Sequence, residues 1–161
     1  MSRTILTEPL TTTAFARYGD VLEAAGAPDR IINQGKCARY HDRARVDVAG
    51  ARVGISIFHA ELRALPYRLE MIERHPEGSQ AFAPMSADPF LVIVSDGPDA
   101  TPRAFLTDGA QAINLHRGTW HGVLTPLSGN GLFAVVDRIG ETPNLEEHWF
   151  EQPWRVERGA S

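Results

Sequence analysis

Hydrophobic and polar positions alternate in short runs along most of the chain, and Gly, Pro, Asp and Asn cluster between these runs. The runs themselves are rich in β-branched and aromatic residues. This pattern is typical of antiparallel sandwiches and barrels, whose strands bury one face. The main runs that we predict as strands span residues 52–60, 67–75, 89–95, 103–107, 111–115 and 131–137.

One of these runs, PFLVIVS, is apolar on both faces. Successive side chains of a strand point to opposite sides. One face therefore carries Phe90, Val92 and Val94, and the other carries Leu91 and Ile93. We expect a central strand that is covered on one side by core and on the other by a second sheet or a second subunit.

Helix signals are few and short. Residues 11–19 offer a Thr N-cap and a closing Gly19, and residues 142–150 are compatible with another short helix. Nothing in the pattern resembles a βαβ repeat. The sequence therefore predicts a mainly β, antiparallel fold with a few short helices.

Composition narrows the class of protein. A chain of 161 residues with 43% hydrophobic content suits one domain, residues 1–161, with a real core. The net charge of -4 and the scattered basic residues argue against nucleic acid as a partner. Cys37 is the sole cysteine, which excludes an intrachain disulfide. With neither a signal-like N-terminus nor an apolar run of roughly 18 residues, we expect no membrane association and a cytoplasmic protein.

The stretch YRLEMIERH contains the first candidate site. Strand alternation puts Glu73 and His75 on the same face as Leu69 and Met71, and the apolar start of this face indicates that it points inward. Ile72 then lies on the outward face, where it would suit a partner surface. Glu73 and His75 are expected at the mouth of a mostly apolar cavity. The alternative is an ion pair between Glu73 and a nearby Arg, with His75 merely capping the strand end.

A second candidate site lies in NLHRGTWHG, where His116 and His121 flank a turn that follows a predicted strand. Imidazoles are common ligands of divalent transition metals, and two hairpins of one barrel could bring His75 and His121 together. His121 is the stronger candidate, because His116 is equally compatible with a structural hydrogen bond to the backbone.

Two further sets of polar residues are candidates for a functional or structural role. Asn33, Arg39 and His41 suit the binding of a carboxylate and an amide, although a solvated edge strand would look the same. Asp137 and Arg138 follow an apolar strand and are interpreted as a structural pair.

The spacing of the two candidate sites resembles the two motifs of the cupin superfamily of small β-barrels. The turn HRGTWH is similar to the second motif, with Gly118 kept and His121 at the metal-ligand position. Glu73, His75 and Gln80 are similar to the first motif, in which this chain keeps one imidazole and has a carboxylate and an amide for the others.

Over a longer stretch the chain is similar to the ureidoglycolate lyase family of that superfamily. The matching blocks, in order, are FARYGDV, INQGKCARYHDRARVDV, ERHPEGSQAFAPM, PFLVIV, RAFLTDGAQAINLHRGTWHGVL and VVDR. The resemblance implies a cupin-like β-barrel of the jelly-roll type and a homodimer. It also implies cleavage of (S)-ureidoglycolate to glyoxylate and urea in allantoin degradation, with a divalent metal, nickel.

That reaction needs a base at the substrate hydroxyl and an acid at the leaving nitrogen. We expect Glu73, His75 and His121 to be catalytic, and His75, Gln80 and His121 to surround the reacting carbon directly or through the metal. Glu73 is then either a further ligand or the proton-transfer group. The expected substrate-binding residues are Asn33, Arg39, His41, Gln80, His116 and Arg117.

Within this set, Arg39 or Arg117 would bind the substrate carboxylate, and Asn33 and His41 would address the urea end. Two other functions remain open from the sequence. One is a different metal-dependent cupin enzyme, such as a dioxygenase or an isomerase. The other is a module that binds a small acid without catalysis.

Overall fold

A computed structural model of the chain describes residues 3–160. It is mainly β, as the alternation predicts, and its one helix within the described residues is short. The elements are β1 (Thr4–Pro9), α1 (Thr12–Phe15), β2 (Gly19–Leu22), β3 (Arg30–Ile32), β4 (Cys37–Arg39), β5 (Arg52–His59), β6 (Tyr67–Arg74), β7 (Gln80–Pro84), β8 (Phe90–Ser95), β9 (Arg103–Leu106), β10 (Ala112–Leu115), β11 (Trp120–His121), β12 (Thr125–Pro126), β13 (Leu132–Ile139) and β14 (Glu146–Glu157).

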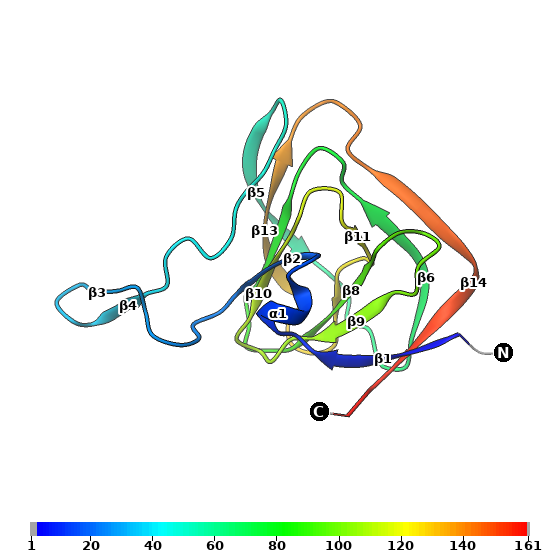
Figure 1. The fold of residues 1–161 in the computed structure, drawn as a ribbon, viewed down its shortest axis with the longest axis horizontal. Coiled ribbons are helices and arrows are strands. Elements are labelled where there is room, and N and C mark those ends of the chain that lie inside the picture. The colour runs from blue at the N-terminus through cyan, green and yellow to red at the C-terminus, as the bar shows by residue number, and fades with distance from the viewer. Residues whose placement is uncertain (1–2, 161) are drawn as a thin grey trace.

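Two large sheets build the fold (Figure 1). The first has the order β11-β6-β14-β1-β9-β8-β12, and an added β11–β8 pairing closes six of its strands into a barrel. The second has the order β2-β10-β7-β13-β5. The predicted cupin-like barrel is therefore confirmed. Its ladders are antiparallel except at β1, which runs parallel to both β14 and β9.

The apolar faces of β8 pack against two separate cores. Phe90 and Val94 join Phe82 and Val135 of the five-stranded sheet in a core between the two sheets. Leu91 and Ile93 face a second core that includes residues of β1, β6 and β14. The two-sided burial predicted for this strand is confirmed, and this chain supplies both covers. The strand therefore offers no surface for a second subunit.

The short helix α1 begins as its sequence predicts. The Thr11 hydroxyl accepts a hydrogen bond from the Ala14 amide at 3.1 Å, which is the usual N-cap arrangement. The helix predicted at residues 142–150 is wrong, because this segment enters the long strand β14. Pairing of β14 with β6 and β1 buries Trp154 and Val156, and that packing outweighs the weak local helix signals.

Alternation along β6 is interrupted. Leu69 and Ile72 are three positions apart, yet both are buried in the same core. Opposite this segment the register of β14 shifts between Trp149 and Trp154. The prediction that Ile72 faces outward toward a partner is therefore wrong, because the shift lets both residues enter one core.

The hairpin formed by β3 and β4, residues 30–39, stands away from the rest of the fold, and we call it the arm. Figure 1 shows it on the far side of the five-stranded sheet from the barrel. None of its residues is buried. No helix among residues 3–160 is long and apolar enough to cross a membrane.

Candidate active site

Glu73, His75 and His121 converge, although they come from distant parts of the chain. β11 pairs with β6 so that His121 lies directly opposite Glu73, and it also pairs with β8. The turn before β11 is tied down because the Gly118 amide donates to the His75 carbonyl at 3.0 Å. One ligand atom from each of the three side chains lies within 4.8 Å of the others. The centroids of the two imidazole rings are 5.2 Å apart.

Both histidines of this cluster are held in one tautomer. His75 Nδ1 donates to the Asn144 carbonyl at 2.8 Å, and His121 Nδ1 donates to the Gly122 carbonyl at 2.8 Å. A carbonyl only accepts, so Nδ1 of each ring carries a proton, and Nε2 is the nitrogen that offers a lone pair when the ring is uncharged. Both Nε2 atoms are buried, and neither has a hydrogen-bond partner within the described residues.

Burial also sets the charge states of the cluster. It raises the pKa of the Glu73 carboxyl; His75 opposes this rise and the Glu147 carboxylate adds to it. Burial lowers the pKa of His121 to about 4, partly offset by its bond to the Gly122 carbonyl. At neutral pH the His121 ring is therefore uncharged, and Glu73 is a stronger base than an exposed carboxylate.

These features fit a divalent transition metal. A histidine that binds a metal through one ring nitrogen usually donates from the other to a carbonyl or carboxylate, as the Nδ1 atoms do here. Glu73 adds a carboxylate oxygen. A buried imidazole nitrogen without a partner is costly unless something binds it. The three residues could therefore hold the metal through His75 Nε2, His121 Nε2 and a Glu73 oxygen.

Gln80 lies on the facing sheet. It shares the inner face of β7 with Phe82, and its amide nitrogen donates to Asp137 at 3.0 Å. A narrow cavity of about 20 Å³ lined mainly by apolar residues reaches His121 from between the sheets. This space holds about one water, so it is too small for the substrate.

Asp137 and Arg138 do not pair with each other, so the predicted structural pair is wrong. They point to opposite faces of β13, and Asp137 binds Gln80 instead. The Arg138 guanidinium donates to the Ala49 carbonyl at 2.7 Å and contacts Glu77 at 3.1 Å. Its side chain is only 5% exposed, so it is a buried cation beside the loop that carries His75.

Sequence reasoning missed the layer that positions His75. Besides the Asn144 carbonyl that fixes His75, the Asn144 side chain accepts from the Glu77 amide at 2.7 Å. Thr142 accepts from Arg138 and donates to Glu77, both at 2.7 Å. No sequence motif marks a backbone carbonyl as a partner, because every residue type has one. The role of Asn144 becomes visible only in three dimensions.

The two other residues of the turn lie beside the cluster. Arg117 donates through Nε to the Pro76 carbonyl at 2.7 Å, next to His75. His116 is exposed and contacts Asp20 at 3.3 Å. The side chain of His116 therefore bonds to a carboxylate, whereas the alternative to a site role was a hydrogen bond to the backbone.

Asn33, Arg39 and His41 are not brought to the cluster of their own chain. Asn33 and Arg39 belong to the arm and His41 follows it, and all three are exposed. Arg39 Nη2 donates to His41 Nδ1 at 2.7 Å, so these two side chains orient each other. Figure 1 places the arm on the opposite side of the molecule from β6 and β14.

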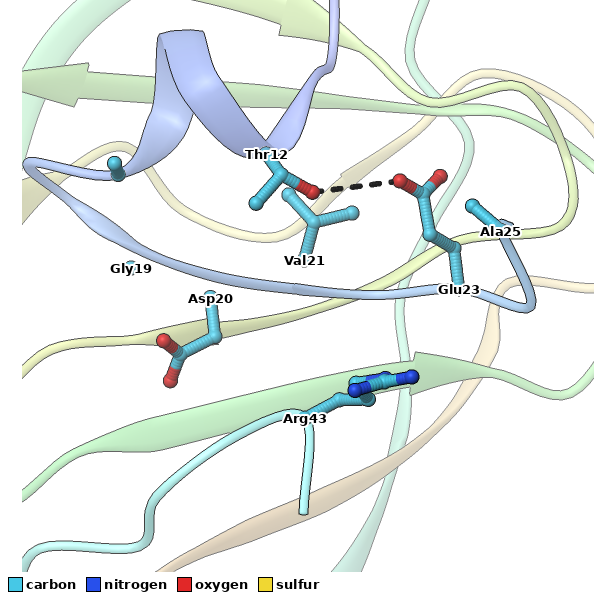
Figure 2. A pocket seen from close by; sticks show the side chains of 8 residues that line it. Thr12, Gly19, Asp20, Val21, Glu23, Ala25 and Arg43 are labelled. Carbon is cyan, nitrogen blue, oxygen red and sulfur yellow. Dashed lines mark hydrogen bonds between the residues drawn. The ribbon is translucent and has the colours of Figure 1, made fainter. Parts of the chain in front are cut away.

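A separate cavity of about 340 Å³ opens between α1, β2 and the segment after the arm. Figure 2 shows Asp20, Glu23 and Arg43 on its walls, with the Thr12 hydroxyl donating to Glu23. None of the predicted site residues lines it. Its link to them is Asp20, which also contacts His116.

Comparison with known proteins identifies the family of the chain. The family model described as ureidoglycolate lyase matches residues 2–157. A Rhodobacter capsulatus protein named ureidoglycolate lyase is 50% identical over 157 residues, which cover 95% of this chain and 98% of that protein. A Chelativorans protein of the same name is 50% identical, with 96% of each chain covered. Rhizobium meliloti ureidoglycolate lyase 2 is 47% identical, with 92% of this chain and 94% of that protein covered. With this match along nearly its whole length, the chain belongs to the ureidoglycolate lyase family.

Proposed function

We propose that this protein is a lyase that cleaves ureidoglycolate to glyoxylate and urea at the Glu73, His75 and His121 cluster. Family membership over nearly the whole chain supports the reaction. The observation that carries the site is the pair of histidines, His75 half-buried and His121 buried, whose buried Nε2 atoms have no hydrogen-bond partner among the described residues and lie beside a carboxyl of raised pKa. Such perturbed groups concentrate at functional sites.

The reaction can proceed with one proton shuttle. Ureidoglycolate has a carbon that bears a hydroxyl, a carboxylate and the urea nitrogen. Glu73 takes the hydroxyl proton, the C–O bond becomes double as the C–N bond breaks, and Glu73 returns the proton to the leaving nitrogen. Glyoxylate and urea result, without added water or a redox partner. A carboxyl of raised pKa suits both halves of this exchange.

His75 and His121 contribute through their fixed Nε2 atoms, which the carbonyls of Asn144 and Gly122 orient. A divalent metal on these nitrogens would polarise the substrate hydroxyl and lower its pKa. The family resemblance suggests nickel. We assign Glu73 to proton transfer because its pKa is raised, and we retain metal ligation as its alternative role.

Gln80 and Arg117 would bind the substrate. The Gln80 amide nitrogen is engaged with Asp137, so its carbonyl oxygen is the atom that would accept from a urea N–H. Arg117 is anchored beside His75 through its bond to Pro76, which leaves its terminal guanidinium nitrogens to donate to an oxygen of the substrate. We further propose that residues 1–161 act as one catalytic domain and form a cytoplasmic homodimer, as the resemblance suggests.

The test is urea and glyoxylate release from ureidoglycolate by the purified protein, measured against the spontaneous rate. We expect release in a one-to-one ratio that scales with enzyme concentration. Saturable binding of ureidoglycolate without product release would instead support a small-acid binding module. Oxygen consumption with bound iron would support another metal-dependent cupin enzyme.

A further inference from the structure

We propose that the arm of one protomer completes the active site of a second copy of this chain, where Arg39 binds the substrate carboxylate. This inference rests on the proposed function, since it names the second chain that supplies part of that site. It goes beyond a homodimer as such, because it assigns the contact surface and a residue that crosses it. Four observations carry it.

The first observation is the arm itself. Each of its strands has three residues and pairs only with the other in the sheet order. A two-stranded hairpin without a covered face is marginal in water. Its base is nevertheless ordered locally, because Asp29 accepts from the His41 amide at 2.8 Å and contacts Arg43 at 2.8 Å. The arm is thus fixed at its base while no other strand pairs with it, so it is suited to contact another molecule.

The second observation is an apolar surface on the same side as the arm. Val135 faces the core between the sheets, so its neighbours Ala134 and Val136 face the opposite side of the five-stranded sheet. Their cross-strand partners, Ile57 and Ile55, are 57% and 77% exposed. β5 is also the last strand of its sheet, with one edge unpaired among the described strands. An apolar face of this kind marks an interaction surface.

The third observation is complementary chemistry between the arm and the exposed residues of β14 beside the cluster. The charged residues of the arm, Arg30, Lys36 and Arg39, are all basic, and Ile31 is 55% exposed. At the cluster, Glu147 pairs across the ladder with Glu73, and Trp149 beside them is 63% exposed. A basic arm with an exposed Ile therefore matches an acidic rim with an exposed Trp.

The fourth observation is the charge beside the cluster. The substrate is a carboxylate, yet Glu73 lies directly opposite another carboxylate, Glu147, in the ladder between β6 and β14. Arg117 bonds to Pro76 beside His75, and a second guanidinium would balance this second carboxylate. Arg74 neighbours Glu73 in sequence, but it is paired with Glu146 at 2.7 Å. A guanidinium from outside would offset this negative charge and bind the substrate carboxylate in a bidentate manner. A twofold dimer makes such an exchange reciprocal, because each chain gives one arm and receives one.

A heterodimer tests this arrangement. Arg39→Ala and His121→Ala chains carrying different tags are co-expressed, and the mixed dimer is purified through both tags. If the arm acts on the partner, the Arg39→Ala chain keeps an intact cluster and receives an intact arm from the His121→Ala chain. One site of two is then restored. We expect about half of the wild-type turnover per dimer, whereas each parent homodimer is reduced about 10- to 100-fold or more.

The matched control pairs Glu73→Gln with His121→Ala, whose defects both lie in the cluster of their own chain, and we expect no recovery there. An Arg39→Ala homodimer with wild-type kcat/KM, a protein that is monomeric by light scattering, or a mixed dimer without recovery would each overturn the role of the arm while leaving the lyase function standing. A fully active His121→Ala homodimer would instead overturn the proposed site, and the arm proposal with it.

Discussion

His121 and Glu73 lie directly opposite each other in the antiparallel ladder between β11 and β6, two segments far apart in the sequence. This pairing brings the turn of the second motif against the strand end of the first. His75, one position beyond β6, then places its ring centroid 5.2 Å from that of His121, with the two rings tilted by 44°. The convergence is a product of strand pairing and gives the two motifs one common site.

Glu73→Gln separates proton transfer from metal binding. The amide keeps the size of the side chain and one oxygen, but it cannot accept and return the substrate proton at neutral pH. We expect kcat to fall about 100-fold or more, with metal content by mass spectrometry unchanged from wild type. Parallel loss of metal and turnover would make Glu73 a ligand in place of the proton-transfer group.

Metal removal should affect stability as well as activity. If a divalent metal binds the Nε2 atoms of His75 and His121, saturating nickel should raise Tm, since a ligand present at 100 times its Kd stabilises by about 2.7 kcal/mol. Calorimetry of chelated protein with and without added nickel measures this shift. The same experiment on His75→Ala should show almost none. An equal shift in wild type and variant would place the bound metal elsewhere.

Arg138→Met tests the layer behind His75. The variant removes a guanidinium that is only 5% exposed and leaves Glu77 without its cation. We expect a loss of about 3 kcal/mol in the free energy of unfolding, with a lower kcat because Thr142 and the loop to Asn144 lose an anchor. Urea unfolding and steady-state kinetics measure the two effects.

The control for Arg138→Met is Arg68→Met. Arg68 pairs with Glu70 at 2.9 Å, but its side chain is 71% exposed. Its loss should change stability by less than about 1 kcal/mol and leave kcat unchanged. Equal losses of stability in the two variants would show that burial does not make the contacts of Arg138 stronger than those of the exposed Arg68.

Much of the fold follows from local pattern. The alternation predicts an antiparallel sandwich or barrel, Thr11 predicts the start of α1, and the uniformly apolar run 90–94 predicts a central strand that is covered on both sides. The strand character of residues 146–157 was missed, because it depends on pairing with β6 and β1. The burial of Ile72 was missed for the same reason: it follows from a register shift in the partner strand, which leaves no local signal in β6.

For the site, the residue types predicted the chemistry, but the sequence did not predict which of these residues lie together and which lie apart. The two motifs indicated that His75 and His121 could meet, and the structure brings their rings together. Nothing in the sequence separates the arm residues Asn33 and Arg39 from that cluster, since their place depends on how the hairpin leaves the barrel. Their roles stay predictions, which the heterodimer experiment addresses.

Asp20 should make the free energy of unfolding depend on pH in the acid range. Burial alone raises its pKa, but hydrogen bonds from Asn114, His116 and the Arg45 amide outweigh burial and hold the pKa below the ordinary 3.8. The stability it contributes is therefore present above about pH 3.8 and is lost as the pH falls through the lowered pKa of the folded state. Between the pKa of the unfolded chain and the lower pKa of the folded state, the unfolded chain binds more protons. The free energy of unfolding therefore falls as the pH falls.

Asp20→Asn measures this contribution. Wild type should exceed the variant by about 1 kcal/mol in the free energy of unfolding at pH 7, and the difference should shrink at pH 3. Urea titrations of both proteins at the two pH values give the comparison. A difference that is the same or larger at pH 3 would show that the Asp20 carboxylate is not favoured by folding.

The most direct test of the central claim is turnover of ureidoglycolate by His121→Ala beside His59→Ala. His121 is 4% exposed and part of the cluster, whereas His59 is exposed at the end of β5. We predict that urea release by His121→Ala falls at least about 100-fold, with the wild-type near-UV circular dichroism retained, while His59→Ala stays within a few-fold of wild type. Wild-type turnover by folded His121→Ala would contradict the assignment of the active site to this cluster.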